Sequence, residues 1–176
     1  MAAIVSTKAG VVPPSAGDAH VKAASLGQIV VSRDGEDVLV AYGLGSCVGV
    51  VGWDPQARVG GLLHALLPQF RPGDNVAKYV DTGILELLRQ MENLGAHRQR
   101  IVWYVVGGAA MLKMPDMKSE FDIGSKNAEM ARQVMERERL HIKVIDVGGT
   151  AGRTVKLNLR DGTVSVKTLG LGEKIL

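Results

Sequence analysis

The chain has 176 residues and a formal net charge of +3, with 46% hydrophobic, 22% charged and 4% aromatic residues. This length suits one domain, and the mild, scattered charge and scarce aromatic side chains argue against nucleic-acid binding. The single cysteine excludes an intrachain disulfide and a cysteine-rich zinc site, and a lone thiol favours a reduced, cytoplasmic setting. No long uncharged apolar run predicts membrane insertion. The sequence does not reveal the oligomeric state, and a monomer is the default expectation.

Residues 1–25 are predicted to be a flexible leader, because small residues and the Pro13–Pro14 pair dominate them. They lack the uninterrupted apolar stretch of a signal peptide, since Lys8 breaks it early. The rest of the chain, 26–176, is predicted to form a single catalytic domain. It opens with two short strands, at 28–32 and 37–42.

Two apolar runs then flank a turn at 54–57, which indicates an antiparallel hairpin. If Trp53 lies opposite Arg58, the same register places Cys47 directly opposite His64. Their Cβ atoms would then be about 4.5–5.5 Å apart, close enough for an imidazole to take a proton from a thiol. The glycines of both runs leave a bulge open as the alternative, and a bulge would turn the two side chains to opposite faces.

Farther along, periodic apolar residues predict a helix at 75–94, capped by Asp74 or Asn75 and ended by Gly95. A second helix is predicted from Ser125 or Lys126 to Leu140, with Ser125 as its N-cap. Strands are predicted at 101–106, 142–147, 153–159 and 163–167. About eight strands, mostly consecutive, and two helices indicate an α+β domain in which the helices pack against a largely antiparallel sheet system.

Cys47 follows a glycine-flanked loop, 43–46, whose backbone N–H groups suit a developing oxyanion. The residues alone leave two interpretations of Cys47 open, a buried small hydrophobe and a nucleophile. His64 likewise fits either a core residue or the base that activates the thiol. The glycine spacing here misses the dinucleotide-binding pattern.

The segment 43–68, GLGSCVGVVGWDPQARVGGLLHALLP, resembles the signature of the CheD family, the chemoreceptor glutamine deamidases of bacterial chemotaxis. Further matches follow in order, and the resemblance covers about 26–167. These matches are KYVD at 78–81, GGAAM at 107–111, IGSKN at 123–127, and the D-x-GG and GR motifs at 146–149 and 152–153.

The resemblance implies a CheD-like cysteine hydrolase fold and a hydrolase of the protein-glutamine glutaminase class, which converts receptor glutamine to glutamate. It also implies hydrolysis of glutamyl methyl esters in some members. Carried over by position, Cys47 is the nucleophile and His64 the base, and no metal or organic cofactor is required. The implied partners are methyl-accepting chemotaxis receptors and a CheC-type phosphatase.

One position departs from the family pattern. The family's threonine, which orients the histidine, is replaced by Ala41. We expect a backbone carbonyl near Ala41, or the hydroxyl of Ser46 or Tyr42, to orient the imidazole instead, and backbone donors near Gly45 and Ser46 to bind the oxyanion. The missing hydroxyl leaves a weakly active or non-catalytic adaptor open as an alternative. A different cysteine hydrolase, such as a toxin-like deamidase, is also open.

Two further motif positions carry expectations of their own. Asn127 is expected to bind the backbone of a neighbouring loop. Arg153 is expected either to meet acidic receptor helices or to lie solvated at a strand edge.

Overall fold

The computed structural model describes residues 20–111 and 122–176. Within these ranges the chain forms ten strands, two α-helices and one short 3-10 helix. In order they are β1 (His20–Ala23), β2 (Gln28–Ser32), β3 (Asp37–Leu44), β4 (Val48–Asp54), β5 (Val59–Ala65), η1 (Val76–Lys78), α1 (Val80–Asn93), β6 (Val102–Gly107), α2 (Ile123–Arg137), β7 (Ile142–Val147), β8 (Arg153–Asn158), β9 (Thr163–Thr168) and β10 (Gly172–Ile175).

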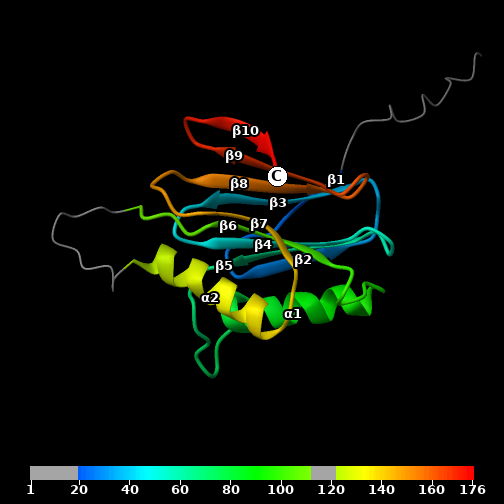
Figure 1. Ribbon diagram of the computed structural model, residues 1–176, viewed down its shortest axis with the longest axis horizontal. Coiled ribbons are helices and arrows are strands. Elements are labelled where there is room, and N and C mark those ends of the chain that lie inside the picture. Colours follow the sequence, from blue (N-terminus) through cyan, green and yellow to red (C-terminus); the bar gives the residue numbers. More distant parts are fainter. Residues whose placement is uncertain (1–19, 112–121) are drawn as a thin grey trace, which may run out of the picture.

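The strands build two five-stranded sheets that stack face to face, with both helices on one side (Figure 1). The first sheet has the order β1-β3-β8-β9-β10, and the second has the order β2-β5-β4-β6-β7. The pairs β1–β3 and β6–β7 are parallel, and the other pairs are antiparallel. The predicted α+β class with a largely antiparallel sheet system is therefore confirmed.

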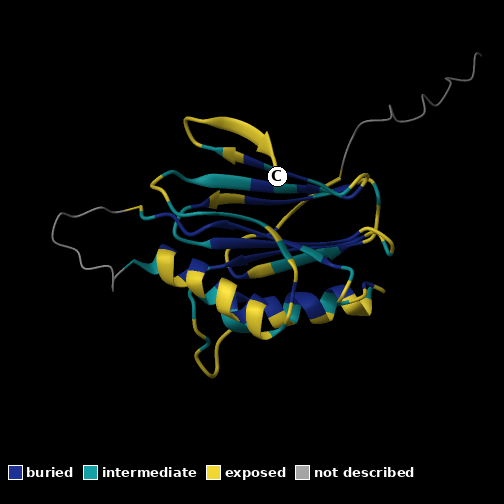
Figure 2. Ribbon diagram, in the orientation of Figure 1, coloured by how far each residue is buried: buried dark blue, intermediate teal, exposed yellow. Residues whose placement is uncertain are grey.

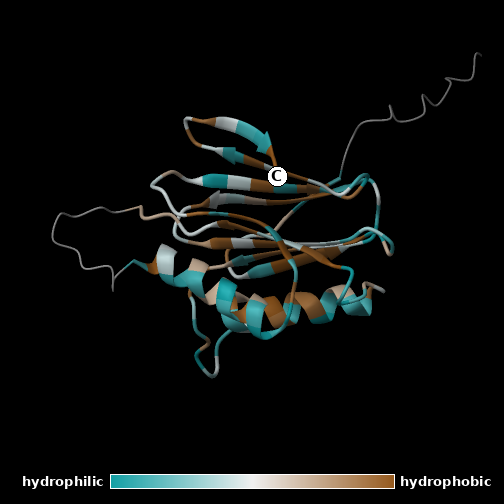
Figure 3. Ribbon diagram, in the orientation of Figure 1, coloured by the Kyte–Doolittle hydropathy of each residue, from teal (hydrophilic) through white to brown (hydrophobic). Residues whose placement is uncertain are grey.

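The two sheets and the pair of helices form three stacked layers, and two hydrophobic cores lie between them. One lies between the sheets and includes Leu39, Val51 and Leu62. The other lies between the second sheet and the helices and includes Leu63 and Leu87. The second sheet is covered on both faces, so β4 and β5 are buried along their whole length and are apolar at nearly every position (Figures 2 and 3).

The predicted leader was drawn too long, because residues 20–23 form β1. This strand pairs in parallel with β3, and the Ala24 N–H donates to the Val40 carbonyl at 2.8 Å. Strand β1 has no apolar alternation, and its place in the sheet rests on backbone hydrogen bonds and on an ion pair between Lys22 and Asp37. Residues 1–19 of the predicted leader lie outside the described residues. Strand β10 is exposed throughout and was not predicted, because it too has no apolar alternation.

Both predicted helices exist, with shifted starts. Asn75 caps η1 by accepting a hydrogen bond from the Ala77 N–H at 3.0 Å, and α1 begins after that turn at Val80. Helix α2 begins at Ile123 and is capped by Asp122, whose carboxylate accepts from the Ser125 N–H, so Ser125 as N-cap was wrong. Among the described residues, each helix is too short or too polar to span a bilayer.

Candidate active site

The hairpin formed by β4 and β5 has a different register from the predicted one. Asp54 lies opposite Val59 and Trp53 opposite Gly60, which makes the loop four residues long. The Asp54 carboxylate accepts hydrogen bonds from two backbone N–H groups of that loop, at 3.0 and 3.1 Å, and so fixes its length. His64 consequently lies opposite Gly49. The predicted direct pairing of His64 with Cys47 is wrong by two positions.

Cys47 and His64 nevertheless share a face of the second sheet. A shift of two residues keeps side-chain parity, because successive residues of a strand alternate between faces. Cys47 packs against the layer between the sheets. His64 lies two residues after Leu62 on β5, so both side chains point to the same face, and Leu62 belongs to that same layer. Cys47 lies one residue before β4, diagonal to His64 across the ladder, a relationship in which Cβ atoms are typically about 7–8 Å apart or somewhat closer.

The His64 ring is buried and held by one nitrogen. Its Nδ1 lies 3.1 Å from the carbonyl oxygen of Ala24, at the end of β1. A carbonyl only accepts, so Nδ1 carries the proton and Nε2 carries the lone pair. Nε2 is buried and has no hydrogen-bond partner among the residues that the structure describes. Burial lowers the pKa of His64, partly offset by the Ala24 carbonyl, so the ring is neutral and its basic nitrogen is unoccupied at pH 7.

The Cys47 thiol is half-buried in the turn between β3 and β4. Burial raises its pKa, and its own backbone N–H partly offsets this rise. A thiol with a raised pKa beside an imidazole with a lowered pKa favours two neutral groups over an ion pair. The arrangement suits a base that removes the thiol proton during attack.

The carbonyls of Gly45, Ser46 and Cys47 all accept hydrogen bonds. The Gly45 carbonyl accepts from the Ala109 N–H at 2.8 Å, and the Cys47 carbonyl accepts from the Gly108 N–H at 2.8 Å. The Ser46 carbonyl accepts from the side-chain amide of Asn127 at 2.9 Å. Within the described ranges, the N–H groups of Ser46 and Cys47 donate to no other residue. Their N–H groups are of the kind that binds an oxyanion, and an oxyanion role near Gly45 and Ser46 stays a prediction.

A glycine permits the close contact that organises this loop. Gly107 ends β6 with a φ of 113°, and a Cβ built there would lie 2.3 Å from the Cys47 carbonyl oxygen. Only glycine lets the backbone of β6 approach Cys47 so closely. The loop 107–110 thus serves as backbone support for the turn that carries the thiol.

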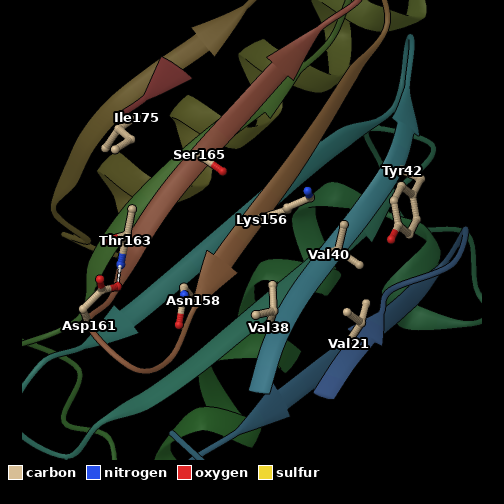
Figure 4. Close-up of a pocket in the computed structure, with 10 residues that line it drawn as sticks. All are labelled: Val21, Val38, Val40, Tyr42, Lys156, Asn158, Asp161, Thr163, Ser165 and Ile175. Atoms are coloured by element: carbon tan, nitrogen blue, oxygen red, sulfur yellow. Dashed lines mark hydrogen bonds between the residues drawn. The ribbon is translucent and has the colours of Figure 1, made fainter. Parts of the chain in front are cut away.

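A cleft of about 290 Å³ opens beside His64 and is lined by the end of β1, the residues after it, Tyr42 and Gly43. A second hollow of about 530 Å³ lies on the outer face of the first sheet, across Val40, Lys156 and Ser165 (Figure 4). Tyr42 lines both hollows and is 55% exposed. The cleft reaches His64 from the side of Ala24, and Cys47 is not one of the residues that line it.

In the described part of the chain, one cluster has the spacing of a metal site. Ligand atoms of His20, Asp34 and Asp37 lie within 4.8 Å of one another. The Asp37 carboxylate is already engaged by the Lys22 ammonium and the Ser32 hydroxyl. This cluster lies at the opposite end of β1 from Ala24, so it has no part in the chemistry at His64.

A family model described as CheD chemotactic sensory transduction matches residues 66–168, more than half of the chain. The chain belongs to the CheD family. It is 38% identical over 160 residues to the probable chemoreceptor glutamine deamidase CheD of Symbiobacterium thermophilum, covering 89% of this chain and 97% of that protein. The probable chemoreceptor glutamine deamidase CheD of Pyrococcus abyssi is 39% identical over 154 residues, covering 85% of this chain and 93% of that protein.

Among solved structures, the hypothetical protein YfiH of Bacillus licheniformis aligns with a TM-score of 0.41 and 11% identity, over 69% of this chain and 51% of that chain.

The segments that resemble CheD motifs converge on the Cys47 turn. The loop 107–110 binds its backbone, and α2 contributes Asn127, which does bind a neighbouring loop as expected. Arg153 is nearly buried, donates to the Gly148 carbonyl at 2.8 Å and pairs with Asp146 at 3.3 Å. The expected solvated position of Arg153 is therefore wrong, and its contact with acidic receptor helices stays a prediction. Its guanidinium holds the backbone beside the CheD glycine motifs.

The position of the CheD family threonine has no hydroxyl here. Ala41 is fully buried in the layer between the sheets. The orienting contact to His64 comes from the Ala24 carbonyl, and none of the predicted candidates near residues 41–46 supplies it. Sequence analysis missed Ala24 because a backbone carbonyl carries no residue signature and because this residue was assigned to the leader.

Proposed function

We propose that this CheD-family chain hydrolyses the side-chain amide of glutamine on the cytoplasmic helices of chemoreceptors, with Cys47 as nucleophile and His64 as base. The names of the curated relatives support the activity and the receptor as substrate. The observation that carries the assignment of roles is the state of His64. One ring nitrogen is held by Ala24, the other has no partner, and the ring lies on the sheet face that Cys47 shares.

In the first step, Nε2 of His64 accepts the thiol proton as Sγ of Cys47 attacks the amide carbon. The new S–C bond pushes the carbonyl electron pair onto oxygen, which faces the N–H groups of Ser46 and Cys47. The proton moves during attack, because burial raises the pKa of Cys47 and lowers that of His64, so both groups start neutral. In this step side-chain rotation brings the diagonal pair within hydrogen-bond distance.

In the second step, the imidazolium returns its proton to the amide nitrogen, the C–N bond breaks and ammonia leaves. A thioester between Cys47 and the substrate remains. His64 then takes a proton from water, the hydroxide attacks the thioester, and the departing sulfur recovers the proton. The products are glutamate and the free thiol. A glutamyl methyl ester follows the same path with methanol as the leaving group.

The Ala24 carbonyl takes the place of the family threonine in this mechanism. It fixes the tautomer and the plane of the ring through Nδ1, which is the task of an orienting group in a nucleophile–base–orienter triad. The substrate glutamine enters by the cleft that Tyr42, Gly43 and the end of β1 form beside His64. The exposed side chains of Leu26 and Tyr42 give that entrance an apolar rim for a receptor helix.

The test is to incubate the protein with a purified receptor cytoplasmic fragment and map conversion of glutamine to glutamate by mass spectrometry. We expect conversion at specific glutamines with the wild-type chain and none with Cys47→Ala. Absence of conversion by a folded wild-type chain would contradict the proposed function.

A second candidate is a weakly active or non-catalytic adaptor that binds receptors or a CheC-type phosphatase. The raised pKa of Cys47 and the absence of a hydroxyl at Ala41 favour it. Binding of the receptor fragment without conversion, at equal affinity for the wild type and Cys47→Ala, would support the adaptor and exclude the deamidase.

A further inference from the structure

The side chain of Asn127 joins the two segments that carry the proposed catalytic pair. It projects from the second turn of α2 and is fully buried. Its Nδ2 donates to the Ser46 carbonyl at 2.9 Å and to the Leu66 carbonyl at 2.9 Å. Ser46 immediately precedes Cys47, and Leu66 follows His64 by two residues. One amide group therefore bridges the turn that carries the thiol and the end of the strand that carries the base.

The orientation of this amide is fixed by its partners. Both partners are carbonyls, so both need an N–H donor, and a side-chain amide supplies two. Its Oδ1 is buried and has no partner within the described residues. Both N–H groups of the Asn127 amide are thus used by the carbonyls of Ser46 and Leu66. An apolar side chain here would leave both carbonyls without this donor.

The hold on Ser46 also sets the direction of a second group. The Ser46–Cys47 peptide is trans, so its N–H points away from its carbonyl. With the carbonyl drawn toward Asn127, the Cys47 N–H is turned to the opposite side. This N–H lowers the pKa of the Cys47 thiol, against the larger rise that burial causes. A backbone N–H on the residue that carries the sulfur is a donor of the kind that binds an oxyanion.

The helix that carries Asn127 is itself fixed against the same turn. A Cβ built at Gly124, one turn before Asn127, would lie 2.4 Å from the Ala109 carbonyl oxygen. Helix α2 thus rests directly on the backbone of the loop that binds Gly45 and Cys47. The helix, the loop and the turn are therefore in direct contact, and Asn127 reaches the Cys47 turn from within this contact.

We propose that Asn127 is a positioning residue for the deamidation, which holds the Cys47 turn at a fixed separation from His64 and aims the Cys47 N–H at the oxyanion. The inference rests on the proposed function for its catalytic consequence. Its structural consequence, the orientation of the Cys47 peptide, can be measured without a receptor.

The experiment compares Asn127→Ala with Val134→Ala in the full chain. Val134 is a fully buried residue of the same helix that packs in the layer between the helices and the second sheet. Its truncation destabilises α2 without touching either carbonyl. Both variants are assayed on a receptor cytoplasmic fragment, at a temperature where circular dichroism shows each to be folded. We expect Asn127→Ala to lower kcat about 10- to 100-fold with KM unchanged. This decrease is smaller than the one caused by removing an oxyanion donor itself. Val134→Ala should leave both constants unchanged.

The second readout is alkylation of Cys47 by iodoacetamide as a function of pH. We expect the midpoint of the alkylation profile to move to higher pH in Asn127→Ala, because the released peptide no longer turns its N–H toward the sulfur. Val134→Ala should keep the wild-type profile. If Asn127→Ala does not fold, Asn127→Ser takes its place, since one hydroxyl can hold one of the two carbonyls. Its kcat and midpoint are expected between those of the wild type and the predicted values for Asn127→Ala.

The outcomes separate the two hypotheses. Equal kcat and equal alkylation profiles for the Asn127 variant and Val134→Ala would overturn the positioning role while leaving the deamidase intact. A wild-type chain that converts no receptor glutamine would overturn the proposed function. The alkylation shift would still decide whether Asn127 orients the Cys47 peptide.

Discussion

The carbonyl oxygen of Ala24 lies 3.1 Å from Nδ1 of His64, across 40 residues of sequence. This contact gives the imidazole a fixed tautomer without any side-chain hydroxyl. Because the contact is a backbone one, the first strand of the domain becomes part of the candidate site. In the proposed mechanism it does the work of the family threonine, whose position holds Ala41 here.

Substitution of proline for Ala24 tests this contact. The Ala24 N–H bonds the Val40 carbonyl at 2.8 Å and thereby fixes the peptide that carries the orienting group. Proline removes that donor, so we expect kcat to fall about 10- to 100-fold, the range known for partners that orient metal-bound histidines. Ala23→Pro is the control, since the N–H of alternate residues in this edge strand points away from β3. Equal kcat for the two variants in the receptor assay would argue against Ala24.

Removal of the proposed pair should abolish conversion of receptor glutamine. We expect Cys47→Ala and His64→Gln each to lower kcat by at least about 1,000-fold, because members of a nucleophile–base unit fail together. The glutamine at position 64 can still donate to the Ala24 carbonyl, which keeps β1 in place but offers no base. Thermal denaturation should show both variants folded. Full conversion by Cys47→Ala would end the nucleophile assignment.

The acid limb of the pH–rate profile should lie below the ordinary range of histidine. Burial disfavours the charged imidazolium and lowers the pKa of His64. The neutral form, which carries the free Nε2 lone pair, therefore persists to lower pH than for a solvated histidine, whose pKa is about 6.5. We expect kcat/KM on a receptor fragment to stay level as pH falls to about 6.5, the pKa of a solvated histidine, and to decline only at lower pH. A limb at or above that value would contradict a buried neutral base.

The free protein should hold Cys47 as a thiol at neutral pH. Burial raises its pKa, so alkylation by iodoacetamide should be slow at pH 7 and should rise with a midpoint above that of an ordinary cysteine, about 8.5. Mass spectrometry of the modified peptide measures this rate. A plateau already reached near neutral pH would show a preformed thiolate–imidazolium pair, and would replace the concerted proton transfer proposed above.

Gly107 should tolerate no side chain. In Gly107→Ala the added Cβ would meet the Cys47 carbonyl oxygen at 2.3 Å, so the turn that carries the thiol must move. Gly95→Ala is the matched control, because it has a similar φ of 101° but nothing within 4 Å of the added atom. We expect Gly95→Ala to lower the free energy of unfolding by about 1–2 kcal/mol through backbone strain alone. Gly107→Ala should cost roughly 1–3 kcal/mol more and lose activity as well. Urea denaturation of both variants measures the difference.

Several features of this protein were readable from its sequence because they depend on side chains. The apolar runs around Asp54 indicated the central hairpin, and the motifs around Cys47 indicated the family. The parity that places Cys47 and His64 on one face also survived, because a shift of two residues leaves the face unchanged.

Only the tertiary structure decided how the site is supported. The register depends on the length of the loop after Asp54, which is set by the hydrogen bonds that the Asp54 carboxylate accepts from the loop backbone. The Ala24 carbonyl and the two carbonyls held by Asn127 are backbone groups, which every residue has, so no pattern of residue types marks them. Residue types specify which faces are buried and which side chains can react, whereas the pairing of distant backbone segments is determined only when the sheets and α2 have packed.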